Sequence, residues 1–266
     1  MTGTRVVSAI FIAAALLGAV LYLPPAWSAA ALSLIILAAA WEWSALLGPR
    51  AAQRVVFLAL TVLLCWLWWQ ASASPGGLRA VLLAAFACWT LAAVWLFTSR
   101  RTSRWLIGVV GLLALSFAWL ALVRMRVDWA RGDHAVVYAL LIVWLADSGA
   151  YFAGRRWGAA KLAPAVSPGK TWAGMWGGLA VCALLAIGIA SWKQLPMLPL
   201  LAVTLLAGAY SVVGDLTESL AKRFAGVKDS GSLIPGHGGV LDRFDSLLAA
   251  APVLMLGAEL LPGLRG

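Results

Sequence analysis

Nine long runs of mostly apolar residues account for most of this chain, and each is bounded by a charged residue, a proline or a glycine. About 20 apolar residues in a helix span the hydrocarbon core of a bilayer, where backbone polar groups must be satisfied within their own segment. Regular alternation of apolar and polar residues is absent, which argues against a transmembrane barrel. We therefore predict an all-α, polytopic transmembrane helical bundle of about nine spanning helices, near residues 6–23, 26–47, 54–71, 78–98, 105–124, 134–153, 172–191, 195–214 and 244–262.

The positions of the basic residues predict how the chain is oriented. The net charge of +10 would suit nucleic acid, but Lys and Arg lie in short loops between the apolar runs, so we expect no nucleic-acid partner. When successive runs alternate across a membrane, fourteen Lys and Arg fall on one side and six on the other. The positive-inside rule places the side with fourteen, and the N-terminus, in the cytoplasm.

The acidic residues divide the chain into two parts. The first 127 residues contain only one acid, Glu42, whereas six acids lie between positions 147 and 245. We expect one integral membrane unit with an N-terminal scaffold over residues 1–130 and a catalytic region over residues 131–266.

The segment from 214 to 246 is too polar to span a bilayer. If the eighth run continues as a helix, Asp215, Ser219 and Lys222 share one face, because they are spaced by four and three residues, and Glu218 lies beside them. Farther along, glycines flank His237, and they allow backbone N–H groups to approach an anion closely. The segment therefore places carboxylates, a hydroxyl and cations beside a membrane.

Asp242 and Asp245 stand three residues apart where the last run begins. If they lay near Asp215, their oxygens would form a site suited to Mg²⁺. A simpler interpretation treats them as helix-capping residues and treats Glu218 and Lys222 as a surface ion pair. Each simple interpretation is plausible for one residue, but the density of acids and bases in one segment favours a functional site.

Two further acids lie within apolar runs. Asp147 is near the end of the sixth run, where it would face a polar cavity or extend to the membrane interface. Glu42, between two tryptophans in the second run, is either functional or paired with a buried basic or polar group. Lys170, in the connection after the sixth run, is a reasonable phosphate ligand.

Three motifs follow one another with fixed spacing: Ser219-Leu-Ala-Lys-Arg223, Lys228-Asp-Ser-Gly231 and Pro235-Gly-His-Gly-Gly-Val-Leu-Asp-Arg-Phe-Asp245. Together they resemble the signature of the phosphatidate cytidylyltransferases, or CDP-diacylglycerol synthases. The segment Ser167-Pro-Gly-Lys-Thr-Trp172 resembles another loop of that family, although Ala173 stands where the family usually has Glu. The helix count and the chain length also agree.

The resemblance implies transfer of a cytidylyl group from CTP to phosphatidic acid, giving CDP-diacylglycerol and pyrophosphate in phospholipid biosynthesis. It further implies an integral membrane enzyme of a bacterial inner membrane that could form a homodimer, and the predicted topology places its active site on the cytoplasmic face. On this hypothesis Mg²⁺, with or without a second cation, is held by Asp215, Ser219, Asp242 and Asp245. The expected catalytic residues are Asp215, Lys222, Asp242 and Asp245, and the expected substrate-binding residues are Ser167, Lys170, Arg223, Lys228, Asp229, His237 and Arg243.

Two alternatives remain at this stage. A secondary transporter would use Glu42 and Asp147 as intramembrane ion sites, but the sequence shows no inverted repeat and the polar segment would have no role. A related lipid enzyme would use another nucleotide or a polyprenyl phosphate, and nothing in the sequence identifies the base directly.

Overall fold

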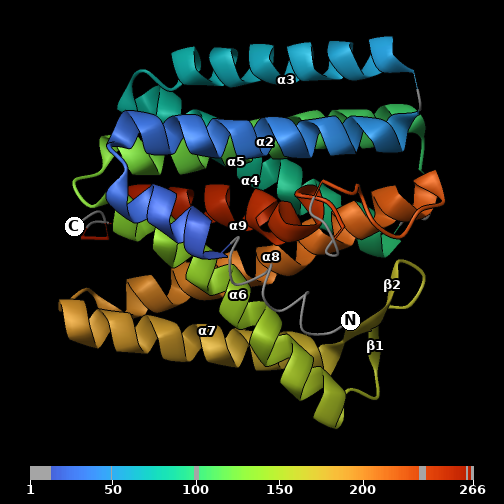
Figure 1. The fold of residues 1–266 in the computed structure, drawn as a ribbon. Helices are drawn as coiled ribbons and strands as arrows, with labels where there is room; N and C mark the ends of the chain where they lie inside the picture. Colours follow the sequence, from blue (N-terminus) through green and yellow to red (C-terminus); the bar gives the residue numbers. More distant parts are fainter. Residues whose placement is uncertain (1–12, 49, 99–101, 234–237, 262, 265–266) are drawn as a thin grey trace.

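A computed structural model describes the chain except for residues 1–12, 49, 99–101, 234–237, 262 and 265–266. Almost all regular structure in the described part is helical (Figure 1). Seven of the described helices are long and apolar enough to cross a membrane. The protein is therefore an all-α integral membrane protein, as the apolar runs predict. The seven are α2 (Pro25–Leu47), α3 (Ala51–Ala71), α4 (Pro75–Thr98), α5 (Arg104–Asp128), α6 (Gly132–Trp157), α7 (Trp172–Lys193) and α8 (Met197–Ala225).

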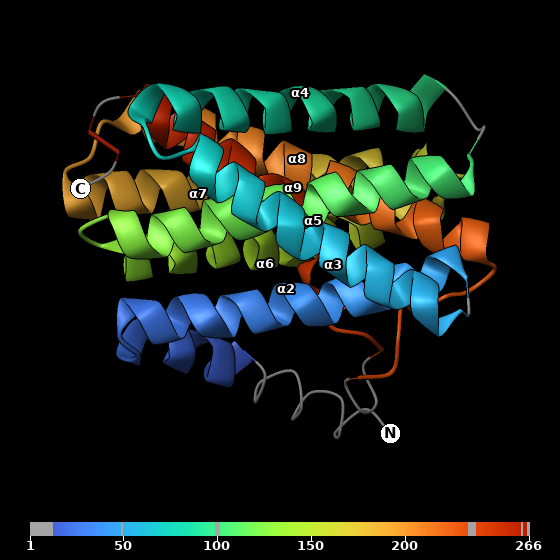
Figure 2. The same ribbon diagram turned by 90° about the horizontal axis from the view of Figure 1, so that it is seen from above.

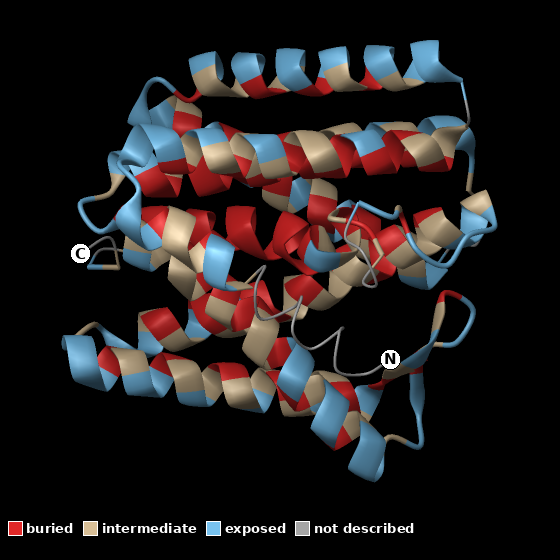
Figure 3. Cartoon of the chain, viewed as in Figure 1, coloured by how far each residue is buried: buried red, intermediate tan, exposed pale blue. Residues whose placement is uncertain are grey.

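The first and last expected helices differ from these seven. The first is described as a shorter apolar helix, Ala13–Tyr22, and residues 6–12 of that prediction lie outside the described part. The last is α9 (Leu241–Leu260), which has the length of a span but carries four charged residues. Other helices cover it, since 15 of its 20 residues are buried (Figure 3).

Helix α9 lies in the middle of the bundle (Figures 1 and 2). It packs against α2, α4, α5, α6 and α8. Leu248 and Met255 are among its fully buried side chains. Helices from both halves of the chain therefore contact α9.

Small residues set the closest helix crossings. Lipid is as apolar as the helix surfaces, so helices associate in a membrane through tight packing rather than through a hydrophobic driving force. A Cβ atom added at Gly149 of α6 would lie 2.8 Å from the carbonyl oxygen of Gly177 in α7. At the crossing of α8 and α9, a Cβ at Gly214 would lie 2.5 Å from the carbonyl oxygen of Asp245. The second crossing therefore places Asp215 of α8 and Asp245 of α9 at the same depth in the bundle.

The connection between α6 and α7, for which the sequence pattern predicts a loop, contains a small antiparallel hairpin. Strand β1 (Lys161–Ala163) pairs with β2 (Ser167–Thr171), with Lys161 opposite Thr171. The Thr171 hydroxyl then caps α7 by accepting the N–H of Gly174 at 3.1 Å. The hairpin and cap fix the direction in which Lys170 leaves the backbone.

Candidate active site

Polar side chains gather at one end of the bundle. The C-terminal ends of α6 and α8, the hairpin and the N-terminal end of α9 all lie there (Figure 1). The two segments that the sequence analysis selected separately, residues 214–246 and 167–172, therefore meet in space.

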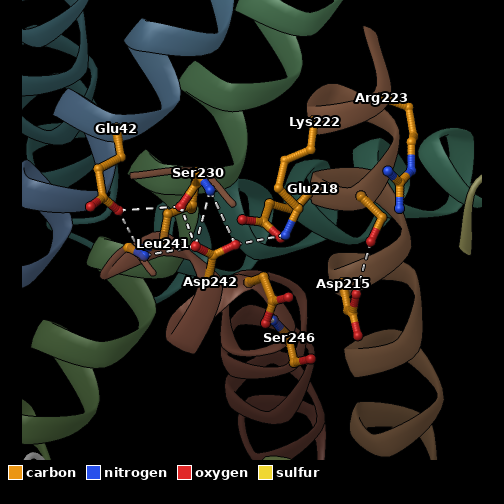
Figure 4. A network of polar contacts seen from close by, with 12 residues as sticks. Glu42, Asp215, Glu218, Lys222, Arg223, Ser230, Leu241, Asp242 and Ser246 are labelled. Carbon is orange, nitrogen blue, oxygen red and sulfur yellow. Dashed lines mark hydrogen bonds and ion pairs between the residues drawn. The ribbon is translucent and has the colours of Figure 1, made fainter. Parts of the chain in front are cut away.

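Helix α8 continues past its apolar part to Ala225, as expected. The Ser219 hydroxyl donates to Oδ1 of Asp215 at 3.2 Å, and Nζ of Lys222 contacts Oε2 of Glu218 at 2.5 Å (Figure 4). Glu218 is completely buried, so its charge depends on Lys222 for compensation. Asp215 and Ser219 therefore lie on one face, as their spacing predicts, whereas Lys222 turns to Glu218, and that pair is largely buried rather than a surface ion pair.

Asp242 is held by protein donors on both of its carboxylate oxygens. Oδ1 contacts Nζ of Lys222 at 2.7 Å, and Oδ2 accepts the N–H of Gly239 at 2.8 Å and the Ser230 hydroxyl at 2.9 Å. The Ser230 N–H also donates to Oδ2 at 3.0 Å (Figure 4). Burial raises the pKa of this carboxyl, but these donors outweigh burial and lower the pKa below its usual value. Asp242 is therefore ionised at neutral pH.

The hairpin supplies a second cation to the site. Nζ of Lys170 lies 2.6 Å from Oδ2 of Asp215, and both side chains are about a quarter exposed. Nε of Arg223 donates to the carbonyl oxygen of Val166 at 3.4 Å, which ties the hairpin to α8. Lys170 and Arg223 therefore both lie at the junction between the hairpin and α8.

Two more carboxylates complete an acid cluster. Asp245 of α9 lies within electrostatic range of Asp215, Glu218 and Lys170. Asp147 of α6 lies within electrostatic range of Asp215 and Lys170. We call Asp147, Asp215, Glu218 and Asp245 the acid cluster.

A pocket of about 210 Å³ opens beside the acid cluster. Asp147 and Lys170 provide its charged wall, and the rest is largely small or apolar. Asp147 therefore lines a pocket, but that pocket is largely apolar, whereas one sequence interpretation expected a polar cavity, and the residue is exposed. The apolar and small lining residues include Ala146, Ala150, Leu162, Gly174, Met175, Gly178, Leu179, Gly208 and Val212.

Four of the five remaining predicted substrate-binding residues are described, in the segments that border the site. Ser167 is half-buried at the start of β2. Lys228 and Asp229 are exposed after α8, and Arg243 is exposed in the first turn of α9. His237 lies outside the described residues.

Two residues that the sequence analysis did not assign to the site, Glu42 and Ser230, hold the polar segment in place. Glu42 is buried, and its Oε2 accepts the N–H of Leu241 at 2.8 Å and the Ser230 hydroxyl at 3.4 Å. Of the two interpretations of Glu42, pairing with buried polar groups is confirmed. In the sequence, Glu42 stands out only as a lone acid in an apolar run. That pattern predicts a buried partner but does not identify it.

The fit of a divalent cation depends on how many ligands the protein must supply. The described residues contain no group of three or more His, Cys, Asp and Glu that could hold a metal ion. Mg²⁺, however, commonly takes one or two protein carboxylates and completes its shell with water and substrate phosphates. Both oxygens of Asp242 already accept bonds from the protein. The same holds for Asp215, whose Oδ1 accepts the Ser219 hydroxyl and whose Oδ2 lies 2.6 Å from Nζ of Lys170, so a cation at either aspartate would have to displace some of these donors. The magnesium site stays a prediction.

Replacing Gly214 with valine is expected to push α8 and α9 apart. The new Cβ would lie 2.5 Å from a backbone oxygen of α9, which cannot rotate away as a side chain can. We expect a loss of about 1–3 kcal/mol in the free energy of unfolding, and a loss of roughly 10- to 100-fold in activity because the carboxylates separate. Thermal unfolding in detergent and steady-state turnover would measure both. Gly188→Val, at a helical glycine with open space around it, is the control, and equal behaviour of the two variants would contradict the packing argument.

The sequence matches the model of the cytidylyltransferase family over residues 3–261. It is 40% identical over 262 residues to a phosphatidate cytidylyltransferase of Pseudomonas aeruginosa, with 95% of each chain covered. It is 36% identical over 281 residues to that of Haemophilus influenzae, covering 95% of this chain and 96% of the relative. A Brucella suis relative of the same name is 38% identical over 229 residues, with 83% and 80% covered. The similarity therefore includes both the apolar scaffold and the polar end of the bundle.

Proposed function

Because the chain belongs to the cytidylyltransferase family, we propose that its polar end transfers the cytidylyl group of CTP to phosphatidic acid, giving CDP-diacylglycerol and pyrophosphate. The protein is thus a nucleotidyltransferase that acts in phospholipid synthesis. The observation that carries this proposal is the gathering of Lys170, Lys222 and the acid cluster at one end of the bundle, where Asp147 and Lys170 also line a largely apolar pocket. The transporter alternative has no support among the relatives, and Glu42 is engaged with the start of α9.

The proposed reaction needs little proton transfer. An oxygen of the lipid phosphate attacks the α-phosphorus of CTP, and the bond from that phosphorus to the bridging oxygen breaks as pyrophosphate leaves with the electron pair. The lipid phosphate is ionised at neutral pH, so it needs no general base. Positioning and electrostatic stabilisation would therefore supply most of the rate.

We assign the cations of the site to the phosphates. Lys170 and Arg223, at the junction of the hairpin and α8, would contact phosphate oxygens together with Lys222. Lys228, Asp229, His237, Arg243 and Ser167 are proposed as further substrate contacts. The pocket beside Asp147 would receive the part of the lipid where the headgroup meets the acyl chains, because its lining is charged at Asp147 and Lys170 and largely apolar elsewhere.

Magnesium is proposed as the cofactor, and a second cation would fit the charge of the acid cluster. Asp215 and Asp245 would hold Mg²⁺, with Ser219 beside Asp215. Binding would displace Lys170 from Asp215, and Asp242 could join only after some of its bonds from Lys222, Ser230 and Gly239 are broken. When bound, the cation would neutralise charge on the triphosphate and on departing pyrophosphate.

The orientation, location and assembly of the enzyme are also proposals. The fourteen Lys and Arg predicted on one side favour an active site that faces the cytoplasm from a bacterial inner membrane. Homodimer formation rests on the family resemblance alone. We assign the basic residues of the loops to orienting the protein in the membrane, and we propose no nucleic-acid partner. We retain residues 131–266 as the catalytic region and residues 1–130 as its scaffold, with Glu42 as the scaffold's contribution to the site.

The proposal predicts that the detergent-solubilised protein releases pyrophosphate from CTP only when both phosphatidate and Mg²⁺ are present. Chelation of Mg²⁺ with EDTA should stop release, and added Mg²⁺ should restore it. Comparing dCTP, UTP and ATP with CTP as donors would test the base. Release without phosphatidate, or substrate uptake into vesicles without turnover, would contradict the proposal.

A further inference from the structure

The start of α9 is stabilised by a residue from the opposite end of the sequence. Val240, which precedes the helix, gives no side-chain cap. Glu42 of α2 instead accepts the N–H of Leu241 at 2.8 Å, across 199 positions of the chain. A carboxylate at a helix N-terminus satisfies an unpaired N–H group and interacts favourably with the helix dipole.

Two glycines allow the backbone to lie directly against this carboxylate. A Cβ at Gly231 would lie 2.3 Å from Oε1 of Glu42, and one at Gly239 would lie 2.3 Å from Oε2. Neither glycine has a positive φ, so close approach rather than turn geometry requires them. We call the two stretches that contact Glu42, residues 229–231 and 238–241, the α9 entry segments.

The same segments hold Asp242. Ser230 donates its N–H and its hydroxyl to Asp242, and Gly239 donates its N–H. The Ser230 hydroxyl also lies 3.4 Å from Oε2 of Glu42. Contacts therefore run without a break from Glu42 through the α9 entry segments to Asp242 and on to Lys222 (Figure 4).

We infer that Glu42 is a positioning residue, which fixes the α9 entry segments and thereby sets the places of Asp242 and Lys222. It acts through these groups and not on a substrate, since its carboxylate is buried against the two glycines. The expected effect on turnover rests on the proposed cytidylyl transfer, but the expected effect on the α9 entry segments does not.

The first test compares three variants in α2. Glu42→Ala should raise the rate of tryptic cleavage after the exposed Lys228 about tenfold and lower kcat by about tenfold, because the Leu241 N–H loses a charged acceptor. KM for CTP should change less than kcat. Glu42→Gln retains an oxygen acceptor and should stay within about threefold of wild type on both measures. Ser44→Ala, a buried change whose hydroxyl bonds only within α2, is the matched control.

The second test uses the fit between Glu42 and Gly231. Gly231→Ala alone should raise cleavage after Lys228, because all three of the nearest atoms to its new methyl group belong to the Glu42 side chain. In the double variant Glu42→Ala/Gly231→Ala that collision is removed, so cleavage should be no faster than in Glu42→Ala. If Glu42→Ala does not fold, Gly231→Ala carries the test by itself.

The outcomes separate the two proposals. Cleavage unchanged in both single variants, or effects that simply add in the double variant, would overturn the positioning role of Glu42. The expected cleavage pattern in a protein that shows no cytidylyl transfer would support the positioning role and count against the proposed reaction.

Discussion

Replacing Lys222 with methionine is expected to reduce cytidylyl transfer by about 10³-fold or more, and to destabilise the protein. Lys222 is the ion-pair partner of two carboxylates, Glu218 and Asp242, and Glu218 is completely buried. Removing one partner of a buried pair leaves an uncompensated charge, which costs about 3–5 kcal/mol. Activity should fall as well, because Asp242 loses its contact with α8. Steady-state pyrophosphate release and thermal unfolding in detergent measure the two effects.

A second substitution distinguishes lost charge balance from lost chemistry. Lys222→Met/Glu218→Gln removes the buried charge, so it should recover much of the stability that Lys222→Met loses. Its activity should stay low, because Asp242 still has no cation beside it. Lys161→Met, at an exposed lysine of the hairpin, is the control for loss of a positive charge. Activity within tenfold of wild type in Lys222→Met would refute the role that we give to Lys222.

Asp215→Asn is expected to have the second large effect, a loss of about 10³-fold in turnover, with little change in stability. Asp215 is the carboxylate that Lys170 and Ser219 both contact, and it lies among the other acids of the cluster. An amide of the same size can still accept the Ser219 hydroxyl. It is a much poorer ligand for a divalent cation, because it has lost the negative charge.

Magnesium titration tests whether that loss occurs through the cation. Asp215→Asn should need a higher Mg²⁺ concentration for half-maximal rate, whereas Ser219→Ala, which removes only the 3.2 Å hydrogen bond, should lower the rate by about tenfold at most. A large loss of rate in Asp215→Asn with an unchanged requirement for Mg²⁺ would show that Asp215 acts in another way. That result would remove the main support for the proposed magnesium site.

Local patterns determined a large part of this protein. The length of the apolar runs specified spanning helices, because a segment in lipid must satisfy its own backbone groups. Helical periodicity put Asp215 and Ser219 on one face, and the structure has them in contact, whereas Lys222, expected beside them, pairs with Glu218 and Asp242. The motif spacing identified the family, which the comparisons support over nearly the whole chain.

Tertiary structure alone decided which side chains meet across the bundle. Asp242 is predicted from the sequence as a ligand of Mg²⁺. In the structure its carboxylate instead accepts bonds from Lys222, Ser230 and Gly239. Lys170 reached Asp215 because the unexpected hairpin directs it there. Glu42 gained its partners because α2 packs beside the start of α9. Such contacts join positions up to 199 residues apart, and they depend on close approach at glycines such as Gly214 and Gly231, which no periodicity within one helix encodes.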